Sequence, residues 1–115
     1  MTIQECYELA GADYGYLMKR FGSEQLLRKY LVKFRQDTSY ARLQSAMEAQ
    51  NAEEAFAAVH MLKGISLNMN FTRLYRISAD LTEMLRGGEM PEDMDKYTEL
   101  QDEYNRISDI LNKIE

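Results

Sequence analysis

The only histidine of the chain, His60, lies among residues whose types and spacing could carry a chemical reaction. Lys63 and Gly64 follow it by three and four positions, and Ala57 precedes it by three, so all three would flank the imidazole on a helix. A neutral imidazole is a competent nucleophile near neutral pH. Its attack on an acyl phosphate would place a phosphoryl group on a ring nitrogen, with Lys63 offsetting the charge of the phosphoryl oxygens.

Gly64 is an unusual residue for the middle of a predicted helix. Glycine there costs about 1 kcal/mol relative to alanine, so its presence needs a physical reason. Close packing against another helix is one explanation, but helical periodicity places Gly64 on the outward face. We therefore interpret it as clearance for a bulky group on His60 and for a partner that approaches closely.

The element that must position His60 is a helix predicted over residues 52–69. Asn51, three residues before Glu54, predicts its N-cap, and Asn70 can adopt the left-handed conformation that ends a helix. Small and apolar residues form one core stripe, and His60 lies roughly 160° from its centre at the helical repeat. The stripe contains Ala55, Ala58, Val59, Leu62, Ile65, Ser66 and Met69.

Apolar or small residues beside His60 predict a surface for docking a partner. These residues are Phe56, Ala57, Met61 and Leu67. The plainer explanation is a scatter of exposed apolar side chains, which is common on soluble proteins. Their position next to a projecting histidine favours the docking surface.

Helix start and stop signals divide the rest of the chain. They predict two short helices, one over residues 3–10 after a capping box at Thr2 and one over 13–21. Two longer helices follow, one from the Ser23 cap to about 36 and one over 40–50, with a break at 37–39. A single bent helix across that break is an alternative. Two more helices are expected, one from a Thr72 N-cap to Arg86 and one with Pro91 in its first turn.

The final helix carries apolar residues at alternating steps of three and four, which is the pattern of a bundle seam. The seam comprises Tyr97, Leu100, Tyr104, Ile107, Leu111 and Ile114. With short connections, these helices predict an all-α fold: an antiparallel up-down four-helix bundle with short additional N-terminal helices, in one domain over residues 1–115. The seam could instead form a homodimeric coiled coil.

Composition excludes several classes of function. A net charge of −5 argues against nucleic-acid binding, and no run of about 18 apolar residues exists that could span a membrane. The N-terminus lacks the features of a secretory signal, and the lone Cys6 cannot form an internal disulfide, so we expect a cytoplasmic protein. One histidine and one cysteine do not favour a zinc site, and no glycine-rich nucleotide loop supports an ATP-dependent kinase.

The segment His60-Met61-Leu62-Lys63-Gly64-Ile65-Ser66 resembles the His-x-Leu-Lys-Gly-x-Ser signature of histidine-containing phosphotransfer (HPt) domains. Arg20-Phe21-Gly22 and the placement of the Phe34 helix also resemble that family. Two residues depart from it: Asn70 replaces a glycine after the histidine helix, and Leu67 stands where a small residue is common.

The resemblance implies a phosphorelay intermediate that accepts a phosphoryl group on Nε2 of His60 from a receiver-domain aspartyl phosphate and transfers it to another receiver. Lys63 then compensates the phosphoryl charge and Gly64 provides steric clearance. The implied partners are response-regulator receiver domains, with a hybrid histidine kinase as a second candidate. No cofactor is expected on this chain, since magnesium would be bound by the receiver, and we expect a monomer.

A different class of function stays open from the sequence. A helical interaction module could bind and regulate a receiver or kinase domain without carrying phosphate, with His60 as a contact residue only. Replacing His60 by glutamine would separate the two hypotheses.

Overall fold

Seven helices and no strand make up the structure, a computed structural model that describes residues 1–115. The prediction of an all-α fold is confirmed. The helices are α1 (Ile3–Leu9), α2 (Tyr14–Phe21), α3 (Glu24–Gln36), α4 (Ser39–Glu48), α5 (Ala52–Asn68), α6 (Thr72–Leu85) and α7 (Asp95–Leu111).

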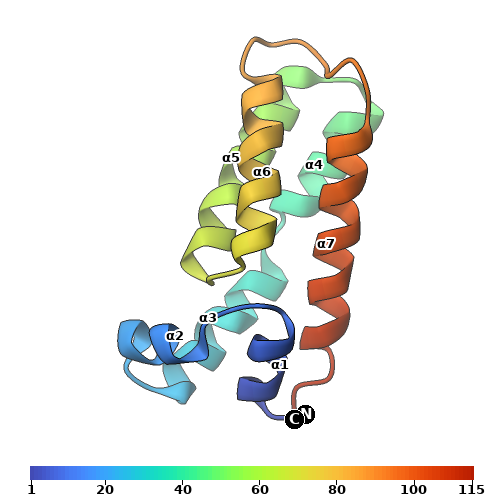
Figure 1. Ribbon diagram of the computed structural model, residues 1–115. Helices are drawn as coiled ribbons and strands as arrows, with labels where there is room; N and C mark the ends of the chain where they lie inside the picture. Colours follow the sequence, from blue (N-terminus) through green and yellow to red (C-terminus); the bar gives the residue numbers. More distant parts are fainter.

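Helices α4 to α7 form the predicted antiparallel bundle (Figure 1). The chain runs up α4, down α5, up α6 and down α7, so that neighbours in sequence are neighbours in space (Figure 1). Helix α3 continues below α4 and, with α1 and α2, covers the lower end of the bundle (Figure 1).

Three predicted caps are confirmed. The side chains of Thr2, Ser23 and Asn51 each accept a hydrogen bond from a backbone N–H in the first turn, and Thr2 and Glu5 complete a capping box. Asp13, expected as the first residue of a helix, instead caps α2 in the same way. The break after α3 is also confirmed, because Asp37 is extended and its carboxylate accepts a hydrogen bond from the Ser39 N–H at 2.8 Å. The alternative of one bent helix is therefore wrong.

Two predicted starts are wrong. The N-cap position of α6 is Phe71, which makes no side-chain cap, whereas Thr72 is already helical and its hydroxyl donates to the Asn70 carbonyl at 3.5 Å. Pro91 lies in the loop before α7, which begins only at Asp95. In that loop the Asp93 carboxylate accepts a hydrogen bond from the Asp95 N–H at 3.1 Å, a local alternative to helix that delays its start.

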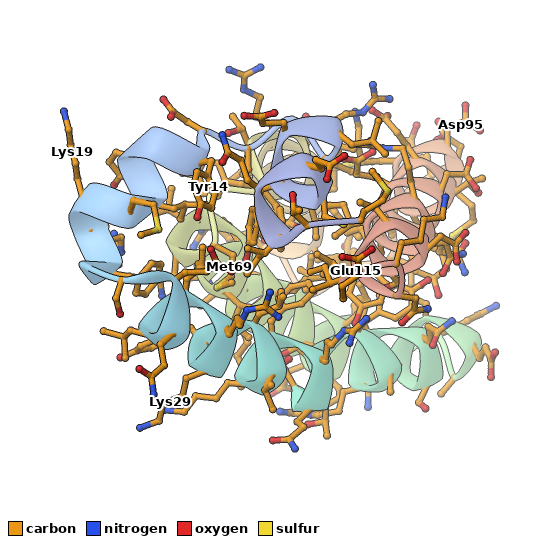
Figure 2. The ribbon with its side chains drawn as sticks, turned by 90° about the horizontal axis from the view of Figure 1, so that it is seen from below. Tyr14, Lys19, Lys29, Met69, Asp95 and Glu115 are labelled. Atoms are coloured by element: carbon orange, nitrogen blue, oxygen red, sulfur yellow. The ribbon has the colours of Figure 1, made fainter.

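The core is continuous from α1 to α7 and includes most of the predicted α5 stripe. Of that stripe only Ile65 is partly exposed. Figure 2, a view from the lower end, shows Met69 in the interior and Lys19 and Lys29 pointing outward.

The seam of α7 packs against the other helices of the same chain. Leu100, Ile107 and Leu111 are buried. The rings of Tyr104 and Tyr40 stack with centroids 3.8 Å apart, which joins α7 to α4. Burial raises the pKa of Tyr40 to about 12.

The two ends of the chain meet below the bundle (Figure 1). The Met1 ammonium donates to the Lys113 carbonyl at 2.9 Å, and the Glu115 N–H donates to the Met1 carbonyl at 3.0 Å. The Arg28 guanidinium adds a hydrogen bond to the Glu115 carbonyl at 3.0 Å. Helix α1 is thereby fixed to the end of α7.

Asn70 ends the region of α5 as predicted and also contacts the N-terminal helices. Its φ is +59°, and the following Phe71 N–H donates to the Ser66 carbonyl at 3.0 Å. The Asn70 side-chain oxygen accepts a hydrogen bond from the Asp13 N–H at 2.8 Å, at the start of α2. A glycine at this position could not make this contact.

Replacing Asn70 by alanine should lower the free energy of unfolding by about 2 kcal/mol, because the variant loses a hydrogen bond and places a less tolerant residue in the left-handed region. Asn70→Gly should cost about 1 kcal/mol, since only the hydrogen bond is lost. Urea denaturation of both variants would test this. Equal losses would show that backbone conformation contributes nothing at this position.

Candidate functional site

Helix α5 directs His60 to solvent because its opposite side is buried. Leu62, Val59 and Ala58 on that side are almost completely inaccessible, whereas His60 is exposed. Helices α4 and α6 both pack against α5 and enclose its buried side. The orientation of His60 therefore follows from burial of small and apolar side chains.

The structure places Gly64 in open space on the exposed face of α5. A Cβ atom built at this position would have no heavy atom within 4 Å outside its own helix backbone. Close helix packing, the alternative explanation for the glycine, is therefore wrong. The space beside His60, one turn along the helix, is free of side chain.

Lys63 is half-buried on the side of α5 that approaches α6. Its positive charge contributes to lowering the pKa of Glu83 on α6, where the larger cause is a hydrogen bond from Arg86. Lys63 is thus a cation placed one turn from His60, and it interacts electrostatically with an acidic group across the α5–α6 contact.

The four predicted docking residues have different environments. Ala57 is exposed, Met61 is 45% exposed and Leu67 is 54% exposed. Phe56 is only partly exposed and packs against the core. Its ring lies nearly parallel to that of His60, with centroids 6.0 Å apart and an interplanar angle of 12°. Three of the four are thus accessible to a partner, and the fourth contacts the histidine.

Sequence analysis missed two arginines that border this face from neighbouring helices. Arg42 of α4 donates to the Glu54 carboxylate at 2.6 Å and to the Met61 sulfur at 3.4 Å. Arg86, the C-cap residue of α6, lies with its Cζ 5.3 Å from the centre of the Phe56 ring. The three-residue spacing of Glu83 and Arg86 in the sequence could have predicted their ion pair. No local sequence pattern, however, relates Arg42 or Arg86 to α5.

The far end of the exposed α5 face contacts α2. The Arg20 guanidinium donates to the side-chain oxygen of Asn68 at 3.0 Å. Next to it, a depression of about 150 Å³ is lined by residues of α3 and α5, including Tyr30, Phe34 and Ile65, and by Asp37. This depression lies on the partly buried flank of α5 and does not include His60.

Neither a metal site nor a membrane span is built into the fold. No group of three or more histidine, cysteine, aspartate or glutamate side chains is placed to hold a metal ion. None of the helices combines the length and the apolar character needed to cross a bilayer.

The structure is thus an antiparallel helical bundle that exposes one histidine beside a lysine and a glycine. The model of one family, the Hpt domain, matches residues 25–110, and this chain therefore belongs to the Hpt domain family. Comparisons with curated proteins and with solved structures gave no match. Helices α1 and α2, with Arg20-Phe21-Gly22, precede the matched residues.

Membership of the family defines the general activity. Hpt domains take part in phosphotransfer in phosphorelays of two-component signalling, where they act as phosphocarriers and not as kinases. They work with receiver domains and kinases. The resemblance noted from the sequence is therefore confirmed at the level of the family.

Replacing Gly64 by alanine should raise the free energy of unfolding by about 1 kcal/mol and at the same time slow phosphotransfer, because the methyl group improves the helix but occupies space beside His60. Urea denaturation and a transfer assay on the same preparation would measure both. Ala57→Gly, on the exposed face of the same helix, is the matched control for the stability measurement and should lose about 1 kcal/mol. A loss of stability in Gly64→Ala would show that the fold itself requires the glycine.

Proposed function

We propose that His60 accepts a phosphoryl group from the aspartyl phosphate of one receiver domain and passes it to the aspartate of another. The observation that carries this proposal is the exposed imidazole of His60 with open space at Gly64, on a chain of the Hpt family. Lys63 and the exposed docking residues Ala57, Met61 and Leu67 support it by their positions around the histidine.

The transfer follows from ordinary nucleophilic chemistry. The lone pair of Nε2 attacks the phosphorus of the acyl phosphate, the bond from phosphorus to the aspartyl oxygen breaks, and the aspartate leaves as a carboxylate. The Nδ1 proton stays on the ring or is released to solvent. Transfer to the next receiver reverses these steps on a second aspartate. Lys63 lowers the barrier by placing positive charge near the phosphoryl oxygens.

The other features of the carrier are part of the same proposal. The chain provides one phosphotransfer site in one domain and acts as a cytoplasmic monomer. It needs no cofactor of its own, since the magnesium ion that receiver chemistry requires would be bound by the receiver. A hybrid histidine kinase that carries a receiver domain is a second candidate partner.

His60→Gln should abolish labelling of this chain by phosphorylated receiver domains, because glutamine retains polarity but has no nucleophilic ring nitrogen. Purified wild type and variant would be incubated with a panel of labelled, phosphorylated receivers, and the label tested for loss in acid. Acid-labile label on the wild type alone is the expected result. Equal labelling of both would place the phosphoryl group elsewhere, and binding without labelling would favour a regulator that does not carry phosphate.

Lys63→Gln should slow transfer about tenfold, which corresponds to about 1.4 kcal/mol of transition-state stabilisation. Lys63→Arg should retain most of the rate, since it keeps the positive charge while changing its geometry. Quenched single-turnover reactions with one phosphorylated receiver would measure both. If the two variants were equally slow, the shape of the lysine side chain and not its charge would be the relevant property.

A further inference from the structure

The ring of Phe56 stacks on the imidazole of His60. Phe56 precedes His60 by four positions, which brings the two side chains to the same face of α5. The ring centroids are 6.0 Å apart at an interplanar angle of 12°, within the range of favourable offset stacking. Because Phe56 also packs against the core, its ring provides a fixed surface for an imidazole that is otherwise exposed.

Phe56 is in turn in contact with the side chain that follows the C-terminal end of α6. The Arg86 guanidinium lies 5.3 Å from the Phe56 ring centre, within the distance of a cation–π interaction. Glu83 accepts two hydrogen bonds from that guanidinium, from Nε at 2.9 Å and from Nη2 at 2.8 Å. Contacts thus run from α6 through Arg86 and Phe56 to His60.

The geometry of stacking matters for the chemistry of an imidazole. The lone pair that attacks phosphorus lies in the plane of the ring, at its edge. A neighbour stacked on the face of the ring limits its rotation and leaves that edge open. Ordering the nucleophile before the partner arrives reduces the orientational entropy that in-line attack would otherwise cost.

From these contacts we propose that Phe56 is a positioning residue, which holds the His60 ring in an orientation ready for phosphotransfer and is itself held by Arg86. This inference rests on the proposed function of His60. It removes Phe56 from the docking surface and leaves Ala57, Met61 and Leu67 there.

The test compares Phe56→Leu, which keeps an apolar side chain without the ring, with Phe56→Tyr, which keeps the ring. Single-turnover transfer from a phosphorylated receiver, at a series of receiver concentrations, separates the maximal rate from the half-saturating concentration. Phe56→Leu should lower the maximal rate about tenfold with the half-saturating concentration within about twofold of wild type, and Phe56→Tyr should restore the rate. A purely structural role would not lower the maximal rate while leaving the half-saturating concentration nearly unchanged.

Two further variants complete the experiment. Val32→Ala removes an exposed apolar side chain of α3, which takes no part in the stack, and should transfer at the wild-type rate. Arg86→Met keeps much of the side-chain volume without the charge and should also lower the maximal rate. It provides the test if Phe56→Leu does not fold, as judged by circular dichroism.

The proposal is overturned if Phe56→Leu reaches the wild-type maximal rate, whether or not its half-saturating concentration rises. A rise in that concentration alone would return Phe56 to the docking surface. An unchanged rate in Arg86→Met would overturn the part assigned to Arg86. Failure of the proposed function is distinguishable from all of these, because wild type would then carry no label.

Discussion

The burial of one face of α5 between α4 and α6 determines which side chains the molecule exposes to a partner. Alanines and a serine on this face allow the neighbouring helices to approach, and Leu62 and Val59 fill the remaining space. A rotation of α5 by roughly 100° that carried His60 toward the buried side would expose part of this face and place the imidazole against the core, where an unpaired ring nitrogen is costly. The exposure of the His60 face is thus maintained by the free energy of burying the opposite face of α5.

Much of this arrangement was predictable from the sequence because its determinants are local. A cap such as Asn51 or Ser23 acts on backbone groups within its own first turn, so a few neighbouring residues suffice to identify it. The periodicity of α5 is equally local, and it predicts both the buried stripe and the outward direction of His60 and Gly64. The resemblance to the Hpt family rests on the same short segment.

The features that could not be predicted depend on how different helices meet. The contact of Arg86 with Phe56 and that of Arg42 with Met61 need the register of α6 and α4 against α5, which no local pattern encodes. Pro91 shows a related difficulty, because its fixed φ suits the first turn of a helix and a loop equally well. Phe56 was accordingly predicted to be on the right face, while its stacking on His60 became apparent only in three dimensions.

Met1 is hydrogen-bonded to Lys113 and Glu115 below the bundle, so the two ends of the chain lie side by side. A module of this kind can be inserted into a surface loop of another protein, since its entry and exit occupy one point and none of its helices has to separate. It can also be circularly permuted, with new ends opened in the loop of residues 86–94 at the opposite end of the bundle (Figure 1). The order of helices along the chain is therefore less constrained than their order in space.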